Sequence, residues 1–452
     1  MKQRRQLKSV LTIALGIALT APLLHAEAAN TLTGWALMPA NTFSDGPTTG
    51  QFASGAGGNP LPLVNMQSVQ GFSAVLNGPS AGSYLFMPDN GFGSQSNSAD
   101  ALLRMYALRP DFKTASGGSG TVAAANYNSG VAVAGFNANS RITLADPNRL
   151  LGFAIQADYT HYYNDAAKPL VDATIRSGRL LTGADFDIEA ARKDKNGNLW
   201  FGEEFGPFLL KTNASGTVLR KEVGMAGVKA PQNPYLGSGV ANLGGSRGFE
   251  GMAINPAGDK LFTLLEGTVT GDPAKTLRIN EFSIDTESYT GQQWRYKLDV
   301  AGTNIGDMTA INNHEFLVIE RNGATATSSG TPFKKIFRID LDQLDAAGNV
   351  HKSEVVDLMN IADPHDLNGD GSTTFTFPFV TIESVLVLDA NTLLVANDNN
   401  YPGIGGRSAL SDNTEFLRIS LAAPVPEPES YALMLGGLAA LGLLKRRRKQ
   451  RG

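Results

Sequence analysis

The fold is decided by the stretch Arg247-Gly-Phe-Glu-Gly-Met-Ala-Ile-Asn-Pro-Ala-Gly-Asp-Lys-Leu-Phe-Thr-Leu-Leu-Glu266. Two short apolar runs are separated by Asn-Pro-Ala-Gly-Asp, a composition that favours a tight turn. We therefore expect a β-hairpin whose first strand carries Glu250 and whose second strand ends on Glu266.

The same hairpin pattern occurs four more times along the chain. In each copy the first strand carries an acid or a serine, a turn follows, and a second apolar run ends on an acid. In chain order the first-strand residues are Ser73, Glu189, Glu250, Asp307 and Glu383, and the second-strand residues are Asp89, Glu204, Glu266, Glu320 and Asp398. The two residues of a copy are 15 or 16 positions apart, except in the fourth copy, where they are 13 apart.

The spacing of the copies predicts the architecture. A third apolar run follows each hairpin, and successive copies from Glu189 onward are 57 to 76 residues apart. Units of three or four strands repeated at such intervals indicate a β-propeller. Ser73 and Glu189 are 116 residues apart, close to two periods, so a degenerate unit is expected between Gly117 and Leu181.

The expected fold is therefore all-β, a propeller of six four-stranded blades. Pairing of the strand near Trp35 with the strand near Phe416 would close the ring without a free edge. A solenoid is the alternative, but it would leave its terminal edges unpaired.

Both ends of the chain carry targeting patterns. Residues 1–28 combine a basic start, an apolar run and small residues, as a signal peptide does, with an uncleaved anchor as the alternative. Residues 425–452 contain Pro-Glu-Pro, a short apolar stretch read as a membrane segment, and a basic cluster. This tail resembles the PEP-CTERM sorting signal of Gram-negative bacteria. The resemblance implies export, a transient inner-membrane anchor and cleavage by an exosortase, which leaves residues 29–424 as the propeller domain.

Composition excludes several classes of protein. The chain has no cysteine, so disulfides, thiolate zinc sites, iron–sulfur clusters and cysteine nucleophiles are excluded. The net charge is −4 and the mature part has no basic stripe, so nucleic acid is not an expected partner. We expect a monomer.

The repeated acids predict a metal site. In a propeller the innermost strands line a central channel, so equivalent positions form a ring of carboxylates that repel one another unless a cation lies among them. Oxygen ligands without cysteine and with few histidines favour Ca²⁺. The expected ligands are Glu189, Glu204, Glu250, Glu266, Asp307, Glu320, Glu383 and Asp398. The structural alternative is that these acids cap turns or pair with nearby arginines.

Other motifs are weaker. Asp366-Leu-Asn-Gly-Asp-Gly371 matches the first half of an EF-hand loop, but Phe377 stands where its last acid belongs. Ser80 and Ser246 lie in nucleophile-elbow patterns without the strand–turn–helix context that an elbow needs.

Three segments carry a family resemblance: Leu181–Glu189, Leu199–Pro207 and Gly248–Ile254. They are similar to the phytase-like family known by the description "esterase-like activity of phytase", and the similarity spans roughly Gly34 to Leu421. It implies a propeller, Ca²⁺ and hydrolysis of phosphate or carboxylic esters. The Arg-His-Gly pattern of histidine acid phosphatases is missing, which excludes that mechanism.

Two functions follow as expectations. The first is a calcium-dependent hydrolase in which Glu204 and Glu250 act as general bases or ligands and Arg247 or Arg321 holds the anion of a small phosphorylated or ester substrate. The second is a non-catalytic scaffold in an extracellular polysaccharide matrix, with Ca²⁺ as a structural ion and an anionic polysaccharide as partner.

Overall fold

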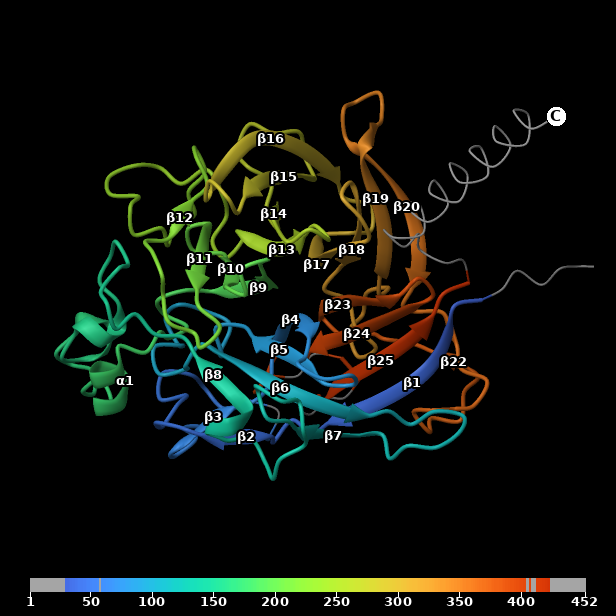
Figure 1. The fold of residues 1–452 in the computed structure, drawn as a ribbon, viewed down its shortest axis with the longest axis horizontal. Coiled ribbons are helices and arrows are strands. Elements are labelled where there is room, and N and C mark those ends of the chain that lie inside the picture. Colours follow the sequence, from blue (N-terminus) through green and yellow to red (C-terminus); the bar gives the residue numbers. More distant parts are fainter. Residues whose placement is uncertain (1–28, 57, 404–405, 408–411, 423–452) are drawn as a thin grey trace, which may run out of the picture.

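Five four-stranded blades are arranged around a common centre in the computed structural model, which describes residues 29–56, 58–403, 406–407 and 412–422 (Figure 1). Three of the blades are separate sheets, and the first and last are joined in one larger sheet. The innermost strands β4 (Phe72–Asn77), β9 (Ile188–Lys193), β13 (Phe249–Ile254), β17 (Asn304–Ala310) and β23 (Thr381–Asp389) contact one another in that order, and β23 contacts β4. The described residues therefore form a closed ring of five blades.

Each blade runs outward from its innermost strand. Blade 1 continues with β5 (Tyr84–Pro88), β6 (Arg104–Asp111) and β7 (Thr121–Ala124), and β8 (Arg141–Thr143) also pairs with β6. Blade 2 continues with β10 (Leu199–Glu203), β11 (Phe208–Thr212) and β12 (Val223–Gly224); blade 3 with β14 (Lys260–Leu265), β15 (Thr276–Ser283) and β16 (Ser288–Lys297); blade 4 with β18 (Glu315–Arg321), β19 (Lys334–Leu344) and β20 (Val350–Asp357).

The ring closes through blade 5, as the sequence predicted. Its strands β23, β24 (Thr392–Asp398) and β25 (Thr414–Ser420) are completed by β1 (Thr31–Met38) from the other end of the chain. β1 runs antiparallel to β25, with Ala36 opposite Phe416. The first strand of the domain is therefore the outermost strand of its last blade.

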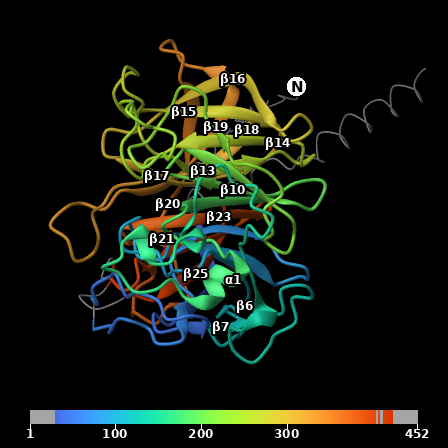
Figure 2. The same cartoon turned by 90° about the vertical axis from the view of Figure 1, so that its left-hand side faces the viewer.

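The expected sixth blade is not found in the described part of the chain. The segment 117–181 holds β7, β8, three short 3₁₀ helices (Ala138–Ser140, Gln156–Asp158 and Tyr162–Asn164) and α1 (Ala173–Gly178). Its apolar residues, among them Ile155 and Ile175, pack into the core between blades 1 and 2. The length of the segment matches one period, but its strands β7 and β8 belong to blade 1, and residues 144–181 form an insertion on one side of the ring, with α1 toward the viewer in Figure 2.

Two small ladders complete the secondary structure. β2 (Phe43–Asp45) pairs with β3 (Met66–Ser68), and β21 (Ile361–Ala362) pairs with β22 (Thr374–Phe375). No helix in the described residues is both long and apolar enough to cross a membrane. The predicted signal peptide and C-terminal membrane segment lie outside these residues.

The hairpin of blade 3 shows why these sequences turn. Gly258 has a φ of +70°, which favours glycine, and Asn255 Oδ1 accepts hydrogen bonds from the backbone N–H groups of Asp259 and Lys260, each at 3.0 Å. Blade 2 repeats the arrangement with Gly197 and Asp194. Side-chain capping by Asx residues therefore fixes the register of successive blades.

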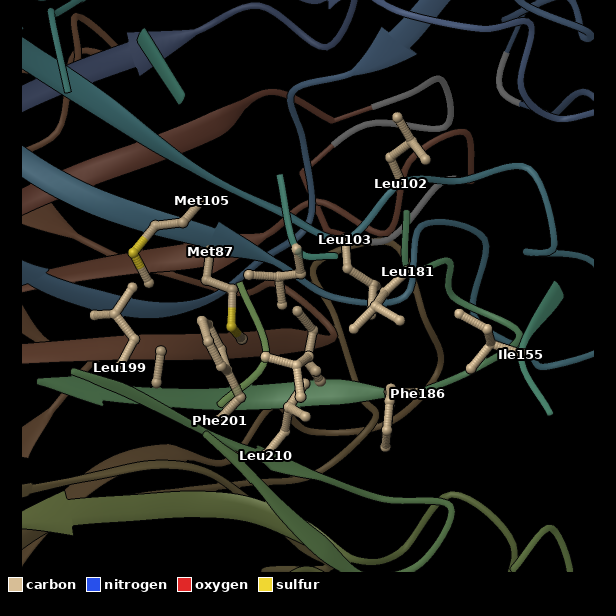
Figure 3. Packing of buried hydrophobic residues seen from close by; sticks show 14 of the residues in the cluster. Met87, Leu102, Leu103, Met105, Ile155, Leu181, Phe186, Leu199, Phe201 and Leu210 are labelled. Atoms are coloured by element: carbon tan, nitrogen blue, oxygen red, sulfur yellow. The ribbon is translucent and has the colours of Figure 1, made fainter. Parts of the chain in front are cut away.

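The main hydrophobic clusters lie between successive blades, so each blade is held by its neighbours. Figure 3 shows one of them, in which Met87 and Met105 from blade 1 face Leu199, Phe201 and Leu210 from blade 2. Fully burying side chains of this size stabilises the fold by about 1.5–3 kcal/mol each.

Replacing Phe201 by alanine tests this packing. The ring is fully buried, so Phe201→Ala is expected to lower the free energy of unfolding by about 3–5 kcal/mol in urea titrations. Val300→Ala is the control, because that side chain is 93% exposed, and it should change stability by less than about 0.5 kcal/mol. Equal effects of the two substitutions would contradict the assignment of this core.

Candidate metal centre in the channel

A β-bulge interrupts the innermost strand of every blade near the same end. In blade 3, for example, Phe249 pairs with Leu265 and Gly251 with Leu264, which leaves Glu250 unpaired. The corresponding residues of blades 1 to 5 are Ser73, Glu189, Glu250, Gly306 and Glu383. Because a bulge re-aims the side chain of its extra residue, the repeat brings one position per blade toward the centre.

The second strand of every blade supplies a further position just beyond the bulge. These residues are Asp89, Glu204, Glu266, Arg321 and Asp398. In blades 1 to 3 their N–H groups donate to the carbonyl groups of Gly71, Asp187 and Gly248 at 2.8–2.9 Å, which establishes their equivalence. Four of the five blades thus present an acid here, and blade 4 presents an arginine.

The sequence assignment for blade 4 was displaced along both strands. It placed Asp307 and Glu320 in the ring, whereas the structure places Gly306 and Arg321 there. The spacing of 13 was the sign of this error, because Gly306 and Arg321 are 15 apart, like their counterparts. At a bulge, a shift of one residue changes which side chain is aimed at the acid cluster.

Asp307 is held away from the cluster by Arg192. Its Oδ1 accepts from the Arg192 guanidinium at 2.8 Å, and that guanidinium also donates to the carbonyl of Met308 at 2.6 Å. Arg192 follows Glu189 by three residues on β9, about 10 Å along the strand. This buried ion pair therefore joins blades 2 and 4 deeper in the ring, as the structural alternative predicted for individual acids.

Glu320 lies between blades 3 and 4. It accepts hydrogen bonds from Lys352 Nζ at 2.6 Å, from the Asp299 N–H at 2.5 Å and from the Tyr296 hydroxyl. Tyr296 and Lys352 belong to the outermost strands of their blades. The structure therefore does not bring Glu320 to the channel.

Eight carboxyl groups remain at the bulged end of the channel, and we call them the channel carboxylates. They are Asp89, Asp187, Glu189, Glu204, Glu250, Glu266, Glu383 and Asp398. All are buried except Asp89, which is partly exposed at the mouth. Six of them were predicted as ligands, whereas Asp89 and Asp187 were not, although the alternation in Asp185-Phe-Asp-Ile-Glu189 places Asp187 on the same strand face as Glu189.

Asp187, Glu189 and Glu204 form the tightest part of this cluster. One oxygen of each lies within 4.8 Å of the others. Asn90 and Ser246 donate to the two oxygens of Asp187, at 2.6 and 3.0 Å, and so orient it. The buried Oε1 of Glu204 has no hydrogen-bond partner in the described residues. An unpartnered buried carboxylate oxygen among other acids is the arrangement that a bound cation would satisfy.

In the described residues, the ion pairs that reach the channel carboxylates come from two arginines. The buried Arg321 contacts Glu383 at 2.7 Å, Glu250 at 3.3 Å and Glu266 at 3.6 Å. Arg247 is half-exposed and contacts Glu266 at 2.6 Å from the rim. Two positive charges face eight acids, and none of these ion pairs reaches the trio on blade 2, although the charge of Arg247 acts on Glu204 from a distance.

Burial and mutual repulsion shift the titration of the trio. Burial raises the pKa of Asp187 to about 6, against hydrogen bonds from Ser246, Glu189 and Asn90. Burial raises the pKa of Glu189 well above its usual range, and the charges of Glu250 and Asp187 add to the shift. Burial also raises the pKa of Glu204, and Glu266 and Asp187 add to it.

The pKa values around Arg321 follow the same physics. Burial, partly offset by Arg321, raises the pKa of Glu383 to about 7. Burial works against the charge of Arg321, but Glu383, Glu250 and Glu266 outweigh it and raise its pKa. Without a further cation, the cluster lowers its negative charge by retaining protons.

The residues present fit a hard divalent cation. Two carboxylates 4.8 Å apart repel by about 3.5 kcal/mol at an effective dielectric constant of 20, so three such pairs cost about 10 kcal/mol, comparable to the whole stability of a domain. Carboxylate oxygens without thiolate or imidazole are the ligands that Ca²⁺ prefers. Asp187, Glu189 and Glu204 would hold the ion, and Glu250, Glu266, Glu383, Asp398 and Asp89 surround them.

The acidic groups around His314 and at Asp366 have partners within the protein. His314 Nδ1 lies 2.9 Å from Asp340 Oδ1 on the outside of blade 4, and Asp342 is exposed beside it. Asp366 accepts from the Gly371 N–H and closes its own turn. These groups show no unpartnered buried oxygen comparable to that of Glu204.

Two pockets lie at the mouth of the cluster, on either side of the loop from Asn90 to Ser98. A pocket of about 260 Å³ is lined by Asp89 and Asp398. A pocket of about 550 Å³ is lined by Phe205, which directly follows Glu204, and by Ser94 to Ser96 from the loop itself. Small molecules therefore have room beside the channel carboxylates.

Two family models match parts of the chain. Residues 67–401 match the model of the phytase-like family, described as esterase-like activity of phytase, and residues 424–449 match the PEP-CTERM protein-sorting motif. No curated protein sequence matches the chain.

Several solved structures resemble the chain at low identity. A luciferin-regenerating enzyme is 11% identical with a TM-score of 0.35, covering 89% of this chain and 98% of its own. An arabinanase of Bacillus subtilis is 11% identical with a TM-score of 0.34, covering 77% and 92%. Regucalcin of Agrobacterium tumefaciens, described as a calcium-binding protein, is 12% identical with a TM-score of 0.34, covering 86% and 99%. These scores carry no information about chemistry.

The raised pKa values predict how calcium stabilisation depends on pH. Acids whose pKa is raised on folding bind more protons in the native state, so the stability of the metal-free protein falls as pH rises from about 4.5 through 6 and 7, where Asp187 and Glu383 titrate. Calcium binds the ionised form and opposes this loss. The calcium-induced rise in Tm, measured by calorimetry, should be larger at pH 8 than at pH 5 by about 5 °C. An increment independent of pH would contradict the assignment.

Replacing Arg321 tests whether the metal binds among the channel carboxylates or beside the deeper ion pair of Arg192 and Asp307. Arg321→Met leaves three carboxylates without their cation and should cost about 3–5 kcal/mol in the absence of metal, with a larger calcium-induced rise in Tm than the wild type. Arg192→Met is the matched control: it breaks another buried ion pair and should destabilise similarly, but its calcium-induced rise should equal that of the wild type. A larger calcium-induced rise in Tm for Arg192→Met than for Arg321→Met would instead place the metal beside Asp307.

Proposed function

This chain belongs to the phytase-like family, and we propose that it is a calcium-dependent hydrolase of phosphate or carboxylic esters. The observation that supports the proposal is the buried trio Asp187, Glu189 and Glu204, which the ion pairs of Arg321 and Arg247 do not reach, with its unpartnered Glu204 oxygen. Hydrolases commonly place such clusters beside a pocket, because shifted pKa values and bound cations both serve proton transfer.

The chain's own residues prepare the site. When bound, Ca²⁺ polarises a phosphoryl or carbonyl oxygen and lowers the pKa of water. Asp187 is oriented by Asn90 and Ser246, so its carboxylate presents the same face to any ligand. The bulges fix Glu189 and Glu250 on rigid strands rather than on mobile loops.

Glu204 is the better-placed general base of the two predicted ones. Glu250 is engaged by Arg321 at 3.3 Å, whereas Glu204 Oε1 is without a partner. In the overall reaction water adds to the ester, its P–O or C–O bond breaks, and the leaving oxygen takes up a proton. Glu204 would accept the proton of the attacking water and return it to the leaving group.

The two arginines have different roles in this proposal. Arg321 is buried among three carboxylates, so it neutralises the cluster. Arg247 is half-exposed at the rim and contacts a single acid, Glu266, so it is the group that would receive the anionic end of a substrate.

We propose that this activity takes place outside the cytoplasm, and the C-terminal sorting motif supports this. Residues 424–449 match the PEP-CTERM motif, which indicates sorting to the cell surface. We propose that signal peptidase removes residues 1–28, that residues 425–452 anchor the chain transiently in the inner membrane, and that exosortase then processes it.

A non-catalytic scaffold is the second candidate, and the depth of the acids favours it. Seven of the eight channel carboxylates are no more than 8% exposed, so a cation there would also join the blades as a structural ion. In that case an anionic polysaccharide would be the partner and no ester would be cleaved.

Glu204→Gln tests the proposal. With Ca²⁺ the wild type is expected to hydrolyse p-nitrophenyl phosphate, p-nitrophenyl acetate or phytate, and chelation with EDTA should abolish this activity. Glu204→Gln removes one ligand charge and the proposed base, so it should weaken calcium binding by about tenfold in titration calorimetry and abolish turnover.

Glu320→Gln is the matched control for this experiment. It neutralises a buried glutamate that lies off the channel, so calcium affinity should remain that of the wild type even if stability falls. Calcium binding without hydrolysis of any of the three esters would leave the scaffold as the function.

A further inference from the structure

The larger pocket at the channel mouth differs in chemistry from the acid cluster beside it. Its volume is about 550 Å³, and it lies between the insertion of residues 144–181 and the loops that precede β11 and β13. A cavity of this size accommodates a single ring or a disaccharide-sized molecule.

Aromatic rings form much of its wall. Phe153, Tyr159 and Tyr163 from the insertion are partly exposed to the pocket, and Phe205 and Phe208 from blade 2 close its floor. Phe153 is fixed by stacking on Phe208, with ring centroids 6.4 Å apart and 23° between the planes. The wall is therefore a preformed set of flat apolar surfaces.

The polar groups of the pocket are neutral amides and hydroxyls. Gln156 and Gln232 line it, and the buried Oε1 of Gln232 has no hydrogen-bond partner in the described residues. Among the residues that the structure describes, no lysine, arginine or histidine lines it, and the one acid that does, Asp185, already accepts from the N–H groups of Gln156 and Thr182. A neutral hydrogen-bonding ligand would satisfy Gln232, whereas a polyanion would find no cation.

Three contacts connect this pocket to the channel carboxylates. Gln232 lies 3.5 Å from the Ser246 hydroxyl, which donates to Asp187 at 3.0 Å. Phe205, which lines the pocket, directly follows Glu204 in the chain. A group bound in the pocket therefore has its edge next to the trio.

We propose that this pocket is a subsite for a neutral sugar ring, and that the substrate of the adjoining cluster is an ester carried on that sugar. A pyranose has flat C–H faces that stack on aromatic rings and equatorial hydroxyls that bond to side-chain amides, which matches the lining group by group. The inference rests on the proposed hydrolytic function for its ester part, and on the pocket alone for its sugar part.

The pocket disfavours two other ligands of the same size. Phytate carries phosphates around its whole ring and would bring several negative charges against a lining without basic residues. A simple aryl group would satisfy the aromatic wall but leave the Oε1 of Gln232 without a partner. The sugar ring is the ligand that uses both kinds of surface.

Calorimetric binding to the full mature protein tests the inference without requiring turnover. The probes are cellobiose and maltotriose as neutral sugars, inositol hexakisphosphate as a polyanion and p-nitrophenol as an aryl group, each with Ca²⁺ and with EDTA. Neutral sugars should bind in both conditions. Tyr159→Ala and, independently, Gln232→Leu should each raise their Kd about tenfold.

Phe333→Ala is the control, because this partly buried ring lies on blade 4, outside the pocket, and it should leave the Kd unchanged. Binding of p-nitrophenol or inositol hexakisphosphate with no binding of either sugar would overturn the subsite, as would sugar binding that Tyr159→Ala and Gln232→Leu do not weaken.

Acetylated cellobiose distinguishes this inference from the hydrolase proposal. Its calcium-dependent deacetylation in preference to p-nitrophenyl acetate would support both. Sugar binding without cleavage of any ester would support the subsite and refute the hydrolase. Cleavage of p-nitrophenyl acetate without sugar binding would support the hydrolase and refute the subsite.

Discussion

Repulsion among buried carboxylates is the constraint on which the centre of this molecule depends. The propeller brings one strand of every blade to the axis, and the bulges aim their extra residues at the same volume. The resulting pairs of acids would each cost several kcal/mol if all were ionised and unpaired. Protonation, an arginine or a bound cation must remove that cost. The charge of the site therefore depends on pH and on metal binding.

Blade 4 shows how part of the cost is removed within the chain. It carries Gly306 and Arg321 where the other blades carry an acid or serine and an acid, so one side of the channel has its own cation. The compensation reaches Glu250, Glu266 and Glu383 but not the trio on blade 2. The asymmetry therefore gives the ring one neutralised side and one side that favours a metal ion, next to the two pockets.

Much of the fold follows from local pattern. Turn residues such as Gly258, alternating strands and the recurrence of one hairpin predicted the blades and their closure by β1, because these depend on residues close in sequence or on a period. The blade count failed because length alone suggested a unit in residues 117–181, where the apolar residues pack into an existing core. The predicted strand register was wrong at Asp307, because the position of a β-bulge cannot be predicted from the alternation of apolar and polar residues.

By itself, the sequence determined that acids recur at equivalent places in a closed β-propeller, that thiol chemistry is absent, and that the C-terminal end carries a PEP-CTERM sorting motif. Tertiary structure decided which acids meet, because Asp187 and Glu204 become neighbours only when bulge, second strand and adjacent loops pack together. It also decided that Asp307 belongs to Arg192 and that an aromatic pocket adjoins the trio. Such contacts join distant segments, and no local pattern encodes the distance between their side chains.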